Sequence, residues 1–108
     1  MATKNPLLHG TLEVLVLKTL SHGPRHGYSI ARWLEDRTGE AIQIEEGSLY
    51  PALYRMEQRG LLASSWGRSE LDRRAKFYEL TKRGRARLDQ EVRAWTAFSE
   101  AVSVVLAT

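Results

Sequence analysis

The residues of this sequence best suited to do chemistry are polar and aromatic side chains on one face of a short helical segment. A rotation of 100° per residue puts the apolar residues of 48–59 on one side of a helix and turns Tyr50, Tyr54 and Arg55 to the other side. Exposed tyrosine offers little solvation but a large contact area, so this face favours a partner. A helix fits the major groove of DNA, where arginine can bind guanine, glutamine can bind adenine and a tyrosine hydroxyl can bind phosphate. The whole outward set is Tyr50, Pro51, Tyr54, Arg55 and Gln58.

The same helix could instead pack beneath the tail of its own chain or of a second subunit, with its tyrosines half buried. A run of positive charge further along the chain bears on this choice. Residues 68–87 hold eight Lys and Arg against three Asp and Glu, whereas the whole chain holds 16 and 13, a net charge of +3. Such a run is a candidate phosphate-binding patch, although it can also be a solvated face that keeps the protein soluble.

The residues that catalysis or a metal site would need do not come together in the sequence. The chain has no cysteine, which excludes a thiolate zinc site and a cysteine nucleophile. His22 and His26 are four residues apart, but Gly23-Pro24 prevents the helical turn that would join them, and no third ligand is evident. Ser48 is not in a nucleophile-elbow motif, and we predict that it caps a helix. We therefore expect no enzyme activity, no catalytic residues, no metal and no cofactor.

The size of the chain fits one small domain. It has 108 residues and a mass of 12.3 kDa, with 43% apolar and 27% charged residues. Because so short a chain has a modest core, we expect it to dimerise. The longest apolar runs, 14–17 and 104–107, are far shorter than the roughly 20 residues of a membrane span, and the first ten residues show no signal peptide. We expect a cytoplasmic protein with no membrane partner.

Apolar spacing and glycine or proline residues divide the chain into elements. The spacing predicts helices over 8–20, 26–37 and 48–59, with Thr38-Gly39 ending the second. If Ser48 caps the third helix, Pro51 falls in its first turn, where a missing amide is tolerated. Residues 41–45 read as a short strand at most.

The last third of the chain predicts a hairpin and a long helix. Residues 61–66 and 75–80 include β-favouring residues and predict two strands with a long basic tip at 67–74. Arg73, Arg74 and Lys76 would lie at this tip, where they could reach the DNA backbone or minor groove beside a bound helix. Thr81 can cap the final helix.

The final helix carries an apolar seam that little in its own chain can cover. Two copies are expected to bury their seams against each other across a two-fold axis, unless the tail folds back on its own core. The element order best fits a winged helix, a mainly α fold with a small β-wing (α+β). Residues 1–80 would form the winged-helix domain and 81–108 the dimerisation helix. The seam residues, at spacings of four and three, are Leu88, Val92, Trp95, Ser99, Val102 and Leu106.

Motifs along nearly the whole chain resemble those of the PadR family of bacterial transcriptional regulators. The resemblance implies a winged-helix fold, a homodimer formed through the terminal helices, and usually repression by binding an operator near a promoter. GSLYPAL is the most specific of these signals. The matching segments are LHGTLEVLVL at 8–17, GPRHGYSI at 23–30, EGSLYPAL at 46–53, MEQRGLL at 56–62 and RRAKFYELT at 73–81.

The resemblance also implies roles for individual residues. His26 and Tyr28, at the start of the second helix, would touch phosphates. Because a single tail helix follows the wing, as in short-tailed members, the dimer would close through that helix together with the first. The recognition helix would use Ser48, Tyr50, Pro51, Tyr54 and Arg55, the wing Arg73, Arg74 and Lys76, and the dimer Leu8, Leu12, Leu88, Val92, Trp95, Val102 and Leu106.

Two roles are compatible with the position of Trp95 in the sequence. In short-tailed, multidrug-binding relatives a tail-helix tryptophan from each subunit lines a cavity where flat aromatic compounds stack, and Trp95 looks like that position, with Phe98 beside it. Interface packing also explains an aromatic residue in such a seam. The sequence thus predicts a repressor that a small aromatic effector could release, and it leaves open a protein-interaction module or a small-molecule sensor that does not read DNA sequence.

Overall fold

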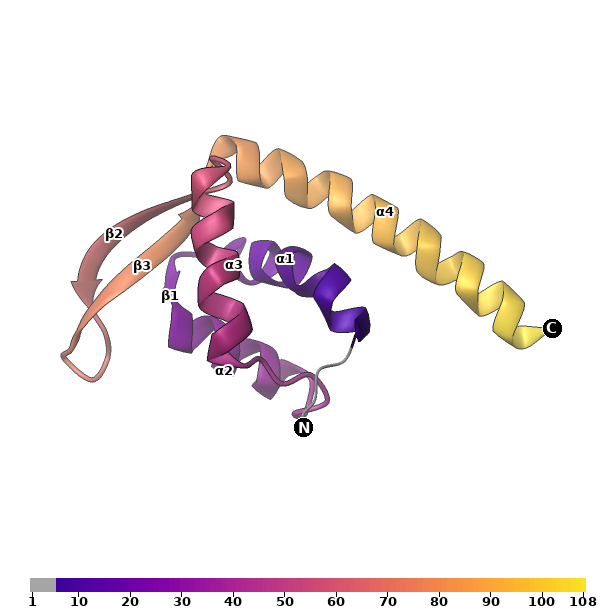
Figure 1. Ribbon diagram of the computed structural model, residues 1–108, viewed down its shortest axis with the longest axis horizontal. Coiled ribbons are helices and arrows are strands. Elements are labelled where there is room, and N and C mark those ends of the chain that lie inside the picture. Colours follow the sequence, from indigo (N-terminus) through magenta and orange to yellow (C-terminus); the bar gives the residue numbers. More distant parts are fainter. Residues whose placement is uncertain (1–5) are drawn as a thin grey trace.

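The fold is that of a computed structural model, which describes residues 6–108 and, within them, the side chains from residue 11 onward. Helix α1, strand β1 and helix α2 lead into α3, which is followed by a β2-β3 hairpin and a long α4 (Figure 1). The mainly α fold with a small wing is as predicted. The elements span Pro6–Leu20 (α1), Arg25–His26 (β1), Gly27–Arg37 (α2), Glu46–Gln58 (α3), Leu62–Arg68 (β2), Arg74–Leu80 (β3) and Lys82–Ala107 (α4).

The first three helices enclose one apolar core. The predicted inner stripe of α3 is fully buried, which leaves the opposite side of that helix to face outward. Strands β2 and β3 close the core from the side of the wing through Leu62, Tyr78 and Leu80. The most deeply buried side chains include Val16, Leu17 and Leu20 of α1, Ile30 of α2, and Leu49, Ala52, Leu53 and Met56 of α3.

Helix α3 begins earlier than the sequence predicts. Its N-cap is Glu45, and the amide of Ser48 donates to the carbonyl of Glu45 at 3.0 Å. The prediction that Ser48 caps the helix is therefore wrong, because this serine is the third helical residue. The acidic side chain of Glu46 in the first turn favours the earlier start, since it opposes the positive end of the helix dipole. Pro51 consequently lies in the second turn, where it lacks the amide that would bond to the carbonyl of Gly47.

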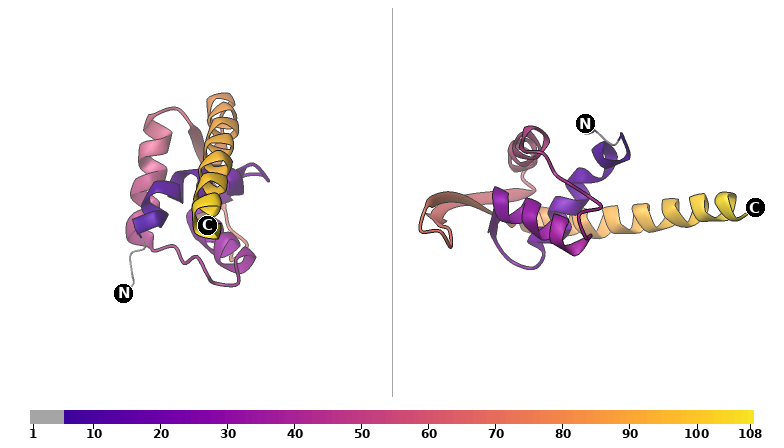
Figure 2. Two further views of the ribbon diagram at one scale, coloured as in Figure 1. Left: turned by 90° about the vertical axis from the view of Figure 1, so that its right-hand side faces the viewer. Right: turned by 90° about the horizontal axis from the view of Figure 1, so that it is seen from below.

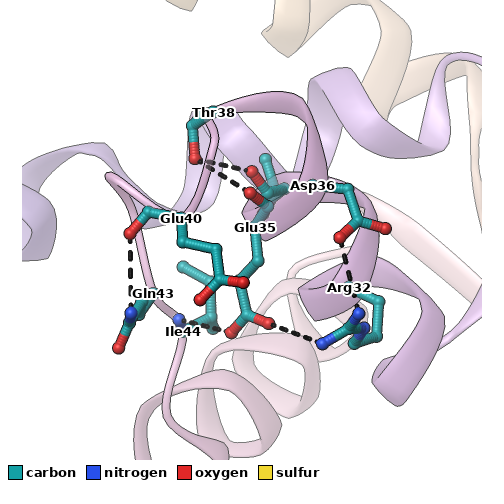
Figure 3. Close-up of polar contacts among 8 residues, drawn as sticks. Arg32, Glu35, Asp36, Thr38, Glu40, Gln43 and Ile44 are labelled. Atoms are coloured by element: carbon teal, nitrogen blue, oxygen red, sulfur yellow. Dashed lines mark hydrogen bonds and ion pairs between the residues drawn. The ribbon is translucent and has the colours of Figure 1, made fainter.

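The loop between α2 and α3 is held by side chains. The hydroxyl of Thr38 accepts a hydrogen bond from the amide of Ile42 at 3.1 Å. A carboxylate oxygen of Glu35 accepts another from the amide of Ile44 at 3.3 Å (Figure 3). Residues 41–45 form no strand, so the expected short strand is wrong: the alternating isoleucines pack against the helical core instead of a sheet. These bonds fix where α3 starts relative to α2.

The wing is a three-stranded antiparallel sheet in the order β1-β3-β2. The predicted hairpin is present, with strands longer and a tip shorter than expected, because the register extends to Arg68 opposite Arg74. The hydroxyl of Ser69 accepts hydrogen bonds from the amides of Leu71 and Arg73, both at 3.3 Å, and so closes the turn of residues 69–73. Strand β1 has two residues and pairs with β3, with His26 opposite Phe77.

Helix α4 begins where predicted. The hydroxyl of Thr81 caps it by accepting the amide of Gly84 at 3.0 Å. Leu88 is buried in the core, but the helix then leaves the body of the protein (Figures 1 and 2). The tail does not fold back on its own chain: exposed fractions are 43% for Val92, 47% for Trp95 and 80% for Leu106.

The contact at Gly84 yields a prediction about stability. A Cβ at this position would collide with the carbonyl oxygen of Leu61, a backbone atom that cannot turn aside. Although alanine normally stabilises a helix relative to glycine, we expect Gly84→Ala to destabilise the fold by about 1–3 kcal/mol. Thermal unfolding followed by circular dichroism measures this change. Gly47→Ala is the control, because nothing lies within 4 Å of its added Cβ, and it should not lower the melting temperature; equal behaviour of the two variants would contradict the collision.

Candidate nucleic-acid interface

The outward face of α3 presents the side chains that the sequence singles out. Tyr54 is 62% exposed, and Arg55 and Pro51 are also exposed. Ser48 is half-buried. One face of the helix is apolar and packs against the core. The opposite face presents an arginine and aromatic rings to a partner.

Tyr50 differs from Tyr54 because it also packs against α2. Its phenol lies so close to Gly27 that a Cβ there would fall within 2.5–2.8 Å of two ring atoms and the hydroxyl oxygen. The glycine at residue 27 therefore leaves the space in which the Tyr50 phenol packs against α2. This partial burial, followed by the nearby charge of Glu46 and by Tyr78, raises the pKa of Tyr50 above its ordinary value. Like any tyrosine at neutral pH, Tyr50 is protonated and has a hydrogen to donate.

The start of α2 holds two predicted phosphate contacts in different environments. Tyr28 is 57% exposed. The ring of His26 is buried and caps α2, because its Nδ1 accepts the amide of Ser29 at 3.2 Å. Its Nε2 lies 3.3 Å from Oε1 of Glu70. The structure thus leaves Tyr28 open to a ligand, whereas both ring nitrogens of His26 have partners inside the protein.

The wing presents a basic and aromatic face next to α3. In the β2-β3 register Trp66 lies opposite Lys76, on the same face of the hairpin as the buried Tyr78. Trp66 is 59% exposed, and the guanidinium of Arg74 lies 4.3 Å above its ring. This stacked pair was missed in the sequence, where Trp66 counted only as a β-favouring residue. The signal that could have found it is strand alternation combined with the hairpin register.

Lys76 is already paired with α3. Its Nζ lies 3.4 Å from Oε1 of Glu57, and its side chain is 38% exposed. The other oxygen of Glu57 accepts a hydrogen bond from the hydroxyl of Ser64 at 2.6 Å. Glu57 therefore joins α3 to both strands of the wing, so that the helix and the hairpin form one surface. Arg73 in the turn and Arg74 at the start of β3 are, by contrast, exposed.

The far end of α3 is fixed to α1. Both terminal nitrogens of Arg59 bind the carboxylate of Glu13, at 2.9 and 3.1 Å. The hydrogen bond to Glu13 raises the pKa of Arg59. Because the loop bond from Glu35 to Ile44 holds the opposite end, α3 is attached at both ends, which preorganises its outward face.

The predicted dimer residues divide into two groups. Leu12 and Leu88 are buried in the chain's own core, so they offer no surface to a second copy. Four others are exposed on the distal part of α4, and the rings of Trp95 and Phe98 lie 6.1 Å apart there. The side chain of Leu8 lies outside the described residues. The exposed seam residues are Val92, Trp95, Val102 and Leu106.

In the described part of the chain, no three His, Cys, Asp or Glu side chains are grouped to hold a metal ion. Likewise, none of the helices described for residues 6–108 is long and apolar enough to cross a membrane.

Comparison with known proteins shows which family the chain resembles. The model of the transcriptional regulator PadR-like family matches residues 16–90, which are 75 of the 108 residues. A PadR family transcriptional regulator from Eggerthella lenta is 35% identical, with 95% of this chain and 88% of that chain covered and a TM-score of 0.80. A transcriptional regulator from Clostridium thermocellum is 26% identical, with 92% and 96% covered and a TM-score of 0.83.

Two further relatives match this chain over almost its full length. A PadR-like transcriptional regulator from Bacillus cereus is 28% identical, with 94% of this chain and 97% of that chain covered and a TM-score of 0.81. An uncharacterized protein from Lysinibacillus sphaericus is 25% identical over 103 residues, which are 95% of this chain and 94% of that protein. The chain therefore belongs to the PadR-like family of transcriptional regulators, which are DNA-binding proteins with this winged-helix fold and not enzymes.

Proposed function

We propose that this protein is a homodimeric repressor that binds a pseudo-palindromic operator. Helix α3 enters the major groove of each half-site, and the wing lies along the adjacent backbone or minor groove. The observation that carries the proposal is the shared surface formed by the exposed face of α3 and the basic wing, joined through Glu57. Its arginines, tyrosines and indole suit a nucleic acid, because they supply charge for phosphate and donors for base edges.

Each part of the surface has a separate task in this proposal. Arg55 and its helical neighbours read bases, because they lie on the outward face of α3. Arg73 and Arg74 bind phosphates or the minor groove, and Tyr28 binds phosphate beside them. The residues assigned to the groove are Ser48, Tyr50, Pro51, Tyr54 and Arg55.

The dimer in this proposal forms through α4. Its distal turns leave a row of large apolar side chains exposed, including Val102 at 37% and Phe98 at 58%. Contiguous apolar surface of this kind favours burial against a second copy, and a two-fold axis brings the same face of both helices together. The two α3 helices would then contact half-sites about 34 Å apart, or a multiple of that spacing. A small aromatic effector would bind between the paired helices at Trp95 and Phe98.

Binding to the DNA upstream of the protein's own gene tests the proposal. Fluorescence anisotropy with that duplex should give tight binding, and an unrelated duplex of equal length should bind more weakly. The logarithm of the affinity should fall linearly with the logarithm of the salt concentration, because phosphate contacts release counterions. A protein-interaction module or a sensor without DNA binding would show no preference between the two duplexes.

Glu57→Gln tests whether the ion pair with Glu57 keeps Lys76 from binding phosphate. The glutamine keeps an oxygen that can accept the hydroxyl of Ser64, but it no longer pairs electrostatically with Lys76. Freed from its partner, Lys76 can reach phosphate, so affinity should rise and the slope of log K against log salt should steepen by about one contact. Folding stability should change by less than about 1 kcal/mol, since the pair is partly exposed. The salt series above measures the slope, and the double variant Glu57→Gln, Lys76→Ala should return the slope to the wild-type value. A slope that stays at the wild-type value would contradict the release of Lys76.

A further inference from the structure

A pair of side chains attaches the turn at the tip of the wing to the body of the protein at the start of α2, through the last residue of β1. Nε2 of His26 and Oε1 of Glu70 are 3.3 Å apart, although the two residues are 44 positions apart in sequence. Glu70 belongs to the 69–73 turn, whereas His26 lies where β1 meets α2. The hydrogen bonds of Ser69 and Asp72 stay within the hairpin, so they shape the turn without attaching it to the body.

The surroundings of His26 determine which nitrogen donates. Nδ1 accepts the amide hydrogen of Ser29, so it carries no proton. The proton of the neutral ring is then on Nε2, which points it at the carboxylate of Glu70. His26 is only 8% exposed, and its ring makes an edge-on contact with the ring of Phe77, with 5.3 Å between the ring centroids. Backbone pairing, helix cap and aromatic contact together hold this donor in one direction.

Glu70 is suited to be the partner of such a donor. Its side chain is 71% exposed, so it depends on this contact rather than on packing for its position. A hydrogen bond from its own backbone amide and the bond from His26 lower its pKa, because both favour the charged form of the carboxylate. A hydrogen bond to a charged acceptor is stronger than one between neutral groups.

We propose that Glu70 and His26 form a latch that fixes the wing tip at the start of α2 and so sets where Arg73 and Arg74 meet DNA. The two arginines follow Glu70 by three and four residues, so any displacement of the turn moves them with it. The latch also keeps them at a constant separation from Tyr28, on the first turn of α2. Glu70 and His26 are positioning residues here and do not themselves touch the duplex. The inference rests on the operator binding proposed above.

The direction in which substitutions of Glu70 change operator affinity distinguishes a positioning role from a purely electrostatic one. An acidic side chain close to DNA repels phosphate, so its removal by itself should strengthen binding. Glu70→Gln keeps an oxygen that can accept from Nε2 but removes the charge, whereas Glu70→Ala removes both. We expect the glutamine variant to bind the operator at least as tightly as the wild-type protein. The alanine variant should bind about three- to tenfold more weakly than the glutamine variant.

Substitution of His26 gives the reciprocal test. His26→Asn places a side-chain oxygen near the position of Nδ1, so α2 keeps an N-cap, but it cannot reach Glu70. Its operator affinity should fall at least to the level of Glu70→Ala, because this variant loses the same contact but keeps the charge that repels phosphate. The double variant should bind like Glu70→Ala, because both changes remove the same contact. Additive losses in the double variant would overturn the latch.

Order of the tip in the free protein provides a readout that does not depend on DNA. Backbone ¹⁵N relaxation should show lower order parameters at residues 70–73 in Glu70→Ala than in Glu70→Gln, at unchanged melting temperature. Equal order parameters and equal affinities in these two variants would refute the latch. If the wild-type protein fails to prefer its upstream duplex, the proposed function fails instead, and the relaxation comparison still decides whether Glu70 holds the tip.

Discussion

Val102→Glu is expected to leave the protein monomeric and to lower its operator affinity by about two orders of magnitude or more. In the single chain this side chain is 37% exposed, so glutamate can remain hydrated and the winged helix should still fold. In the proposed dimer the same carboxylate would be buried in the α4 seam without a partner, which costs several kcal/mol. A monomer engages one half-site and loses the gain from simultaneous binding to two, which typically reaches 10²–10⁴.

Light scattering after gel filtration gives the mass of this variant, and anisotropy with the operator gives its affinity. Ala97→Glu is the matched control, because a rotation of 100° per residue puts Ala97 on the opposite side of α4 from the seam. It adds the same charge on the same helix and should remain dimeric, with nearly normal affinity. A proven Val102→Glu monomer that binds at full strength would show that operator binding does not need the α4 dimer.

Arg55→Ala and Arg73→Ala are expected to weaken DNA binding in different ways. Arg55 lies on the outward face of α3, where a bidentate contact to guanine would distinguish that base by about 1–3 kcal/mol. Its loss should relax preference at one operator position while leaving affinity for unrelated DNA nearly unchanged. Arg73 lies on the wing turn, and its loss should weaken all duplexes alike and reduce the salt slope by about one.

A panel of operators with single base-pair changes separates these effects. Each protein is titrated against every duplex at one salt concentration, and the spread of affinities measures its selectivity. Arg93→Ala is the control for net charge, since Arg93 is exposed on α4 and far along the chain from the recognition surface. If Arg55→Ala and Arg73→Ala reduce all affinities by the same factor, the division between base reading and phosphate binding is wrong.

Local patterns in the sequence were sufficient to predict the helices. The inner stripe of α3 follows from a 3.6-residue period, and the cap of α4 at Thr81 from one side chain that accepts an amide three residues later. The start of α3 was less predictable, because a serine can cap a helix or lie inside its first turn, and Ser48 lies inside. Strand β1 could not be found locally, since its two residues become a strand only by pairing with β3.

The candidate surface shows the same division between local and long-range information. Exposure of Tyr54 and Arg55 follows from the helix period, and both were predicted. The partners of Lys76 and His26 come from distant parts of the chain, Glu57 in α3 and Glu70 in the wing turn. The contact of Lys76 with DNA was predicted from its place near the hairpin tip, and that of His26 from the resemblance to the PadR family. Only the folded arrangement reveals that internal acids already bind them.

The close contact between Tyr50 and Gly27 bears on how this scaffold could be retargeted. Residues 54, 55 and 58 project from α3 without entering the core, so a library varied there can change the recognised bases while the scaffold stays intact. Residue 50 is under a different constraint, because its ring also serves as the spacer between two helices that meet at a glycine. Evolution or engineering that changes residue 50 therefore alters the contact between α2 and α3 together with the recognition surface.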